Sequence, residues 1–339
     1  ASDVYKRQFM NPASDLDHSY GAIMREGGLL DIFYIGVKTS LYPCLIFMGV
    51  GTMTDFGPLI ANPKSLLLGA AAQLGIFMTY VGTQFMGFTN QQSASIGIIG
   101  GADGPTAIFV TSRLAPELLG PIAVAAYSYM ALVPVIQPPV IRALTTKKER
   151  MIRMDYNEER ASKLALILFP IIVTAVAGII VPMSAPLVGS LMFGNLIREC
   201  GVLDRLSKTA QNELANLVTI LLGITIGGTM VADKFLRVDT LLILALGLFA
   251  FVFDTAGGVL FAKLLNVFRK KKINPMVGAA GISAFPMSAR VIQKMAKEED
   301  PYNFILMQST SANVSGQLGS IVAGGMVISL VSMLLGGIW

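Results

Sequence analysis

Residues 97–113, GIIGGADGPTAIFVTSR, combine glycines, a proline and one aspartate within a long apolar stretch. A helix does not run cleanly through GGADGP, because in a helix interior glycine costs about 1 kcal/mol and proline about 3 kcal/mol. The flanks are apolar enough for a membrane, where broken backbone survives only if protein or a water-filled cavity covers it. An ionisable residue at that depth marks a functional site by default. Asp103 therefore indicates an ion pathway.

The composition is that of a polytopic membrane protein. Hydrophobic residues make up 53% and charged residues 14% of the chain, whereas soluble domains carry roughly 25% charged residues. Several apolar runs reach the ~20 residues that span a bilayer. The net charge of +5 lies in loops, so we interpret it as a topology signal and expect no nucleic-acid partner.

Two sequence features exclude other classes. Cys44, Cys200 and the single histidine, His18, occur without a CxxC motif, which argues against a zinc site or a disulfide framework. Residues 1–28 are polar and lack the apolar core of a signal peptide.

Apolar segments recur along the chain, and two of them are interrupted by glycine and proline. The uninterrupted segments lie near 30–54, 65–88, 119–144, 164–183, 185–199, 210–231, 240–267 and 303–338, and the interrupted ones near 93–112 and 277–297. The Lys/Arg-rich loops 145–163 and 268–274 are expected in the cytoplasm. Counting spans from these loops requires each interrupted segment to leave the membrane on the side from which it enters. Such segments are re-entrant hairpins or discontinuous helices.

The two interrupted segments resemble each other. GADGPTAIFVTSR (101–113) aligns without gaps with GAAGISAFPMSAR (278–290), and the tripeptide GTM at 51–53 recurs at 228–230 with the same spacing of 177 residues. Two matches at one spacing indicate an internal duplication.

The two copies are expected to have opposite orientations. The segment before the first hairpin ends in uncharged FTNQQ (88–92), whereas its counterpart ends in Arg269–Lys272, so the positive-inside rule places their entries on opposite sides. Inverted repeats with interrupted segments are typical of transporters whose site lies near the midplane. We predict an all-α polytopic membrane protein with inverted repeats and two re-entrant or discontinuous segments.

We divide the chain into five parts on this basis. A polar N-terminal segment (1–28) precedes a first membrane repeat (29–145), a basic cytoplasmic loop (146–163), connecting membrane helices (164–200) and a second membrane repeat (201–339).

Asp103 is either a turn or cap aspartate, or a cation ligand or proton carrier. The glycines around it allow backbone carbonyls to turn inward, and hard cations such as Na⁺ prefer such oxygens. Thr106 would add a hydroxyl.

The second hairpin has Ala280 in place of the aspartate and offers Asn274, Gly278, Ser283 and Arg290. Arg290 is either a snorkelling arginine at the cytoplasmic boundary or an anion clamp, because its planar fork suits a carboxylate.

Four more polar side chains interrupt apolar spans. Tyr127 and Tyr129 are either packing aromatics or donors of a hydrogen bond or proton. Asp254 is either a cap before Gly257-Gly258 or a second cation ligand. Asn313 lies among small residues that allow close helix packing, and its amide oxygen would complete an ion site.

The stretches Gly100–Met154 and Asn274–Lys294 strongly resemble the β subunit of sodium-pumping biotin-dependent decarboxylases. That family serves oxaloacetate, glutaconyl-CoA, methylmalonyl-CoA and malonate decarboxylases, and the resemblance runs from about residue 28 to the C-terminus. It implies that carboxybiotin on a partner subunit loses CO₂, a proton is consumed and Na⁺ is exported.

The resemblance also implies roles for particular residues. By motif match the family's functional residues fall on Asp103, Tyr129, Asn274, Gly278, Ser283 and Arg290. We expect Asp103, Tyr129, Ser283 and Arg290 to be catalytic, with Arg290 holding the carboxylate of carboxybiotin. The candidate Na⁺ ligands are Asp103, Thr106, Asn274, Gly278, Ser283, Asp254 and Asn313.

The implied partners are a biotin carrier, a carboxyltransferase subunit and a small membrane-anchoring subunit, in a homo-oligomeric complex of a bacterial or archaeal cytoplasmic membrane. A secondary Na⁺-coupled carboxylate transporter is the alternative. Members of the family usually begin with another span, whereas residues 1–28 are polar here, so we interpret the N-terminus as truncated.

Overall fold

The computed structural model describes residues 28–154, 161–230 and 237–336, and every element in these ranges is helical. Within these described ranges, five helices are long and apolar enough to cross a membrane: Pro63–Phe85, Pro116–Leu144, Lys163–Ile180, Val238–Phe268 and Leu306–Leu334. Leu29–Lys38 and Leu41–Met53, bent by 64°, make a sixth if they are one span. The prediction of an all-α polytopic membrane protein is confirmed. The N-terminal prediction, except for Gly28, lies outside the described residues.

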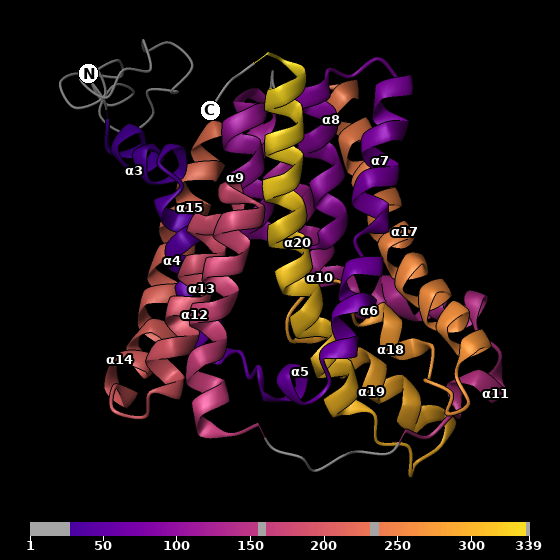
Figure 1. The fold of residues 1–339 in the computed structure, drawn as a ribbon. Coiled ribbons are helices and arrows are strands. Elements are labelled where there is room, and N and C mark those ends of the chain that lie inside the picture. Colours follow the sequence, from indigo (N-terminus) through magenta and orange to yellow (C-terminus); the bar gives the residue numbers. More distant parts are fainter. Residues whose placement is uncertain (1–27, 155–160, 231–236, 337–339) are drawn as a thin grey trace.

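The helices form two neighbouring groups in the bundle (Figure 1). The first group contains α3 (Leu29–Lys38), α4 (Leu41–Met53), α12 (Lys163–Ile180), α13 (Ala185–Glu199), α14 (Asp204–Thr209) and α15 (Ala215–Thr229). The second contains α5 (Gly57–Ala61), α6 (Leu66–Ala71), α7 (Leu74–Phe85), α8 (Asn90–Gly97), α9 (Gly104–Leu114), α10 (Leu119–Leu144), α11 (Lys147–Arg150), α17 (Val238–Phe268), α18 (Met276–Ala279), α19 (Met287–Glu299) and α20 (Leu306–Leu334).

Glycines set the close packing within the first group. A Cβ atom at Gly51 of α4 would overlap the carbonyl oxygen of Leu191, and one at Gly194 of α13 would overlap that of Met48. Helices in lipid associate through such small residues because apolar burial alone does not drive them together. At about 1.5 Å per residue, α13 and α15 are each about 22 Å long, since each has 15 residues. α13 covers the predicted segment 185–199 in full, whereas α15 is shorter than the segment expected at 210–231 because a π-helical turn (Ala210–Leu214) precedes it.

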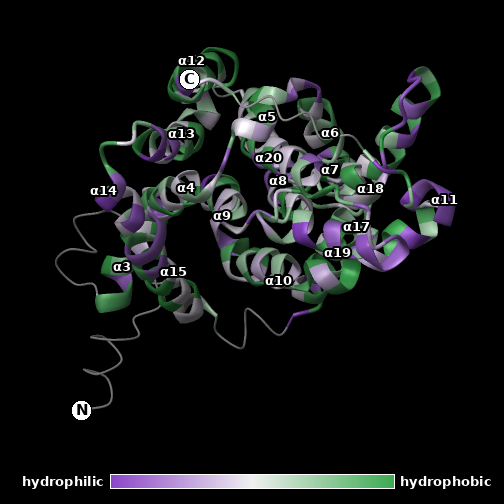
Figure 2. Cartoon of the chain, turned by 90° about the horizontal axis from the view of Figure 1, so that it is seen from below, coloured by the Kyte–Doolittle hydropathy of each residue, from purple (hydrophilic) through white to green (hydrophobic). Residues whose placement is uncertain are grey.

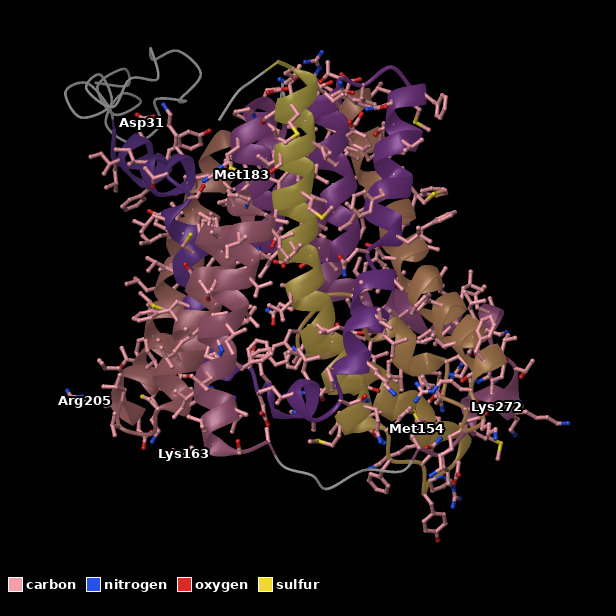
Figure 3. The ribbon with its side chains drawn as sticks, viewed as in Figure 1. Asp31, Met154, Lys163, Met183, Arg205 and Lys272 are labelled. Atoms are coloured by element: carbon pink, nitrogen blue, oxygen red, sulfur yellow. The ribbon has the colours of Figure 1, made fainter. Side chains whose placement is uncertain are left out.

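The basic segments gather at one end of the bundle. Figure 3 shows Lys163, Arg205 and Lys272 at its lower end and Asp31 near the upper end. Seen from below, α11 and α14 are largely hydrophilic whereas α12 is green, the hydrophobic colour (Figure 2). By the positive-inside rule we expect the lower end to be the cytoplasmic one.

The two interrupted segments form hairpins that enter from opposite ends. In the first, α8, a 3₁₀ turn (η2, Ile98–Gly101) and α9 descend from the upper end and return to it (Figure 1). In the second, α18, an irregular turn and α19 enter from the lower end and return there. This arrangement agrees with the predicted pair of oppositely oriented re-entrant segments.

Helices from the two predicted repeats interleave in the second group. α17 packs against α7 and α10, and α20 packs against α6, α9 and α19. The repeat boundaries at 145 and 201 stay a prediction, but the interleaving brings both hairpin tips together between α6, α17 and α20.

Candidate functional site

The tips of the two hairpins are joined by hydrogen bonds in the interior. The backbone N–H of Ser283 donates to the carbonyl oxygen of Gly101 over 3.1 Å. Ser320 of α20 lies between the tips, with its hydroxyl 2.8 Å from Asp103 Oδ2 and 3.1 Å from Ser283 Oγ. The structure therefore brings three predicted site residues, Asp103, Thr106 and Ser283, into one cluster with Ser320.

Asp103 is the N-cap of α9. The structure thus shows the capping role, which is one of the two alternatives that the sequence left open. It accepts hydrogen bonds from the Thr106 N–H (3.2 Å) and the Thr106 hydroxyl (2.7 Å). Ala102 before it has φ 52°, a left-handed conformation that costs an L-residue about 1–2 kcal/mol. This turn ends the 3₁₀ segment and directs the carboxylate, which is 6% exposed, towards Ser320.

Several oxygen atoms of the cluster surround the Ser320 hydroxyl. The Ser320 hydroxyl has one proton, yet Asp103 Oδ2, Ser283 Oγ and the Gln317 carbonyl all lie within 3.1 Å of it. A hydroxyl donates one hydrogen bond only, so acceptor oxygens remain around it. One carboxylate with neutral hydroxyl and carbonyl oxygens is a ligand set for a hard cation of low charge. The geometry suits Na⁺ as a transported substrate.

Asn313 supports the second tip from α20. Its Nδ2 donates to the carbonyl oxygen of Ile282 over 2.7 Å, and its buried Oδ1 has no partner among the described atoms. It therefore lies beside the cluster and positions the neighbour of Ser283.

Asp254 lies on α17 and is fully buried. Its Oδ1 accepts hydrogen bonds from the Gly75 and Ile76 N–H groups, so it caps the N-terminus of α7 and not a turn in its own helix. Its Oδ2 faces Gly100 and has no partner in the described structure. The structure thus places Asp254 against η2 and α7, without a hydrogen bond to the Asp103 cluster.

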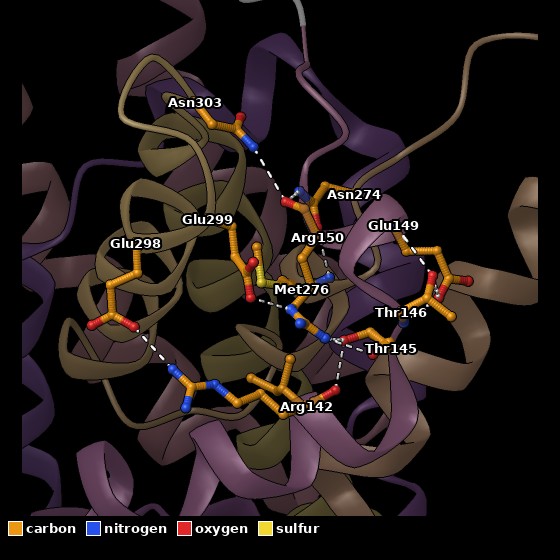
Figure 4. A network of polar contacts seen from close by, with 11 residues as sticks. Arg142, Thr145, Thr146, Glu149, Arg150, Asn274, Met276, Glu298, Glu299 and Asn303 are labelled. Carbon is orange, nitrogen blue, oxygen red and sulfur yellow. Dashed lines mark hydrogen bonds and ion pairs between the residues drawn. The ribbon is translucent and has the colours of Figure 1, made fainter.

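Asn274 and Gly278 lie away from the tip, at the base of the second hairpin. Asn274 Nδ2 donates to the carbonyls of Arg150 (2.8 Å) and Ile152 (2.9 Å), within the network of Figure 4. In the same network Arg150 pairs with Glu299 of α19. A Cβ at Gly278 would overlap the carbonyl oxygen of Gly258, so this glycine permits contact between α18 and α17. Both residues hold the hairpin in place.

The two tyrosines of α10 point to different partners. The Tyr129 hydroxyl donates to the carbonyl oxygen of Leu244 in α17. The Tyr127 ring lies on Gly104, where a Cβ would be 2.7 Å from the ring, and its buried hydroxyl has no partner among the described residues. Tyr127 is therefore the tyrosine beside Asp103, although motif matching selects Tyr129.

Arg290 is exposed on α19, which lies at the lower end of the bundle (Figure 1). It lines a cavity of about 460 Å³ together with Gln293, Lys294, Lys297, Glu298 and Leu306. A second cavity of about 890 Å³ lies between α5, α12 and α20, and its basic lining residues are Arg153, Arg269, Lys271 and Lys272. Both cavities offer cations to an anionic ligand, and Arg290 belongs to the smaller one.

Ser320 and Gln73 are the polar residues of this region that sequence reasoning missed. Ser320 follows the run STSANVSGQ, which is noticeable only for its small residues, and Gln73 is a single amide within an apolar span. Gln73 lies between α6 and α7, and its Nε2 donates to Gly281 and Gly316. Neither residue belongs to a motif, so each is recognised as part of the candidate site only from its contacts in the structure.

Comparison with known proteins gives consistent matches. A family model described as Na⁺-transporting oxaloacetate decarboxylase beta subunit matches residues 7–331. The chain is 57% identical over 315 residues to methylmalonyl-CoA decarboxylase subunit beta of Propionigenium modestum, covering 92% of this chain and 80% of that protein. It is 56% identical over 311 residues to the oxaloacetate decarboxylase beta chain of Klebsiella pneumoniae, covering 90% and 72%.

Proposed function

Because the chain belongs to the Na⁺-transporting oxaloacetate decarboxylase beta subunit family, we propose that it couples decarboxylation of carboxybiotin to Na⁺ export. It is a multi-pass membrane protein and a subunit of a multi-subunit decarboxylase. The comparisons favour this sodium-pump function over a secondary Na⁺-coupled carboxylate transporter.

The Na⁺ site of the proposal is the cluster at the hairpin tips. The observation that carries it is the Ser320 hydroxyl, which joins Asp103 of the first hairpin to Ser283 of the second. An ion bound there contacts elements that open to opposite ends of the bundle. Binding therefore responds to any movement of one hairpin relative to the other, as a coupled transport step requires.

Arg290 is the proposed contact for the carboxylate of carboxybiotin. It lies on the return helix of the second hairpin, seven residues after Ser283 in the chain, and is exposed at the cytoplasmic end. Neighbouring Lys294 and Lys297 add positive charge to the same cavity. An anion bound there acts on the helix that carries the hairpin tip, which supports a connection between decarboxylation and the ion site.

A tyrosine of α10 is the proposed proton donor. Tyr129 is the residue that the resemblance selects, but its hydroxyl proton is engaged by Leu244. The unpartnered hydroxyl of Tyr127, beside Gly104 and hence next to Asp103, supports Tyr127 as the donor in this chain.

The biotin belongs to a carrier partner, and the proposed complex further includes a carboxyltransferase and a small membrane-anchoring subunit in a bacterial or archaeal cytoplasmic membrane. The chain would form homo-oligomers within it. Membranes containing this chain and its partners should decarboxylate free carboxybiotin only when Na⁺ is present. Arg290→Lys keeps the charge but loses the planar fork, so the half-saturating carboxybiotin concentration should rise. Decarboxylation at full rate in K⁺ alone would contradict the proposal.

A further inference from the structure

The side-chain amide of Gln73 has a defined orientation. Gln73 lies at the break between α6 and α7 and is 3% exposed. Its Nε2 is 3.1 Å from the Gly69 carbonyl oxygen, 3.3 Å from that of Gly281 and 3.3 Å from that of Gly316. Exchanging its O and N atoms would place Oε1 against three carbonyl oxygens, all of which are acceptors. The NH₂ group therefore faces these carbonyls, and Oε1 faces away from them.

That oxygen faces the first hairpin and has no hydrogen-bond partner among the described residues. A Cβ placed on Gly101 would lie 3.5 Å from Gln73 Oε1 and 3.3 Å from Ser320 Cβ, so both side chains approach Gly101. Ser320 in turn contacts the Asp103 carboxylate. Buried polar atoms in native proteins are nearly always paired, and an unpartnered oxygen near a buried carboxylate is a candidate ligand of a cation.

The backbone around Gln73 is held in place independently of the hairpins. The Ile76 N–H donates to the Gln73 carbonyl oxygen over 3.2 Å, and Asp254 caps the same end of α7. Gln73 thus projects from the break between α6 and α7. Its Nε2 bonds Gly281 of the second hairpin, and its Oε1 lies near Gly101 of the first hairpin.

We propose that Gln73 Oε1 is a neutral oxygen ligand of the Na⁺ held by Asp103. Through the contact of its Nε2 with Gly281, Gln73 also makes ion affinity depend on the position of the second hairpin. This inference rests on the proposed function and extends its ion site to the α6–α7 break.

The test measures Na⁺ binding by the purified complex, as the thermal shift over a Na⁺ titration at constant ionic strength, with choline as the replacement cation. Gln73→Met should raise the Na⁺ midpoint at least about tenfold. Gln137→Met is the matched control, because Gln137 is also buried and bonds the second hairpin, but its oxygen is already used by Ser288. It should lower the Na⁺-free melting temperature and leave the Na⁺ midpoint unchanged.

The outcomes separate the two claims. An unchanged midpoint in Gln73→Met, or an equal rise in Gln137→Met, would overturn the inference while leaving the Asp103 site intact. A wild-type complex without any Na⁺-specific shift would instead reject the proposed function. If Gln73→Met does not fold, Gln73→Asn keeps the amide and withdraws its oxygen by one methylene, and the same two outcomes decide.

Discussion

Asp103→Asn should separate the stability of the fold from ion binding. In the absence of Na⁺ the carboxylate is buried, accepts hydrogen bonds from Thr106 and Ser320, and has no cationic partner among the described residues. Asparagine keeps one acceptor oxygen, and the Thr106 and Ser320 hydroxyls can rotate to accept from its NH₂ group. Removing a buried charge that has no counter-ion is neutral or stabilising. We therefore expect the Na⁺-free melting temperature of the variant to equal or exceed that of the wild type.

Sodium binding should be lost in the same variant. Two unit charges about 2.4 Å apart attract each other by about 7 kcal/mol at an effective dielectric constant of about 20. The ion loses its hydration in both proteins, so this cost cancels in the comparison. Even about 4 kcal/mol of the attraction corresponds to about a thousandfold loss of affinity.

The assay is the melting temperature of the complex in K⁺ and in increasing Na⁺. At a Na⁺ concentration about 100 times the dissociation constant, the wild type should gain about 2.7 kcal/mol and Asp103→Asn nothing. Asp254→Asn is the comparison, since Asp254 is equally buried but contacts the N-terminus of α7. The reasoning is refuted if Asp103→Asn keeps the Na⁺-dependent gain, or if Asp254→Asn alone loses it.

Three further outcomes are expected. Gly316→Ala would force a Cβ into a carbonyl oxygen of the second hairpin, so the free energy of unfolding should fall by about 3 kcal/mol or more, and an unchanged denaturation midpoint would contradict this. Tyr127→Phe should slow decarboxylation with little change in stability, whereas Tyr129→Phe should cost about 1 kcal/mol in thermal unfolding, and the reverse pattern would exchange their roles. The hydrogen bonds and charge of Arg153 lower the pKa of Asp300, so the pair stabilises the cytoplasmic loop above the carboxyl's ordinary pKa of about 3.9. That contribution is lost as pH falls through the lowered value. Amide hydrogen exchange of residues 150–154, corrected for its intrinsic pH dependence, should therefore accelerate in the wild type as the pH falls through the pKa of Asp300. It should not accelerate in an Asp300→Asn variant.

The sequence determined the membrane class, the apolar segments and the two Gly/Pro interruptions, but not the breaks that divide 30–54 into α3 and α4 and 65–88 into α6 and α7. Each predicted feature depends on local composition: apolar runs of bilayer length, glycine and proline that break a helix, and Lys/Arg in the loops. It also marked Asp103 as a candidate site residue, because an ionisable side chain at membrane depth indicates a functional site. The opposite orientation of the hairpins followed from charge alone.

Only the tertiary structure decided which oxygens surround Asp103. Ser320 is 217 residues away from Asp103 in the chain. Gln73 lies at the break between α6 and α7, outside both hairpins. Asn274, matched by motif, instead donates hydrogen bonds to the carbonyls of Arg150 and Ile152 at the hairpin base. Serine, glutamine and asparagine carry no charge that marks depth or direction, and each forms hydrogen bonds wherever packing places it. Their roles therefore depend on how α6, α20 and the hairpins fit together, which no local pattern encodes.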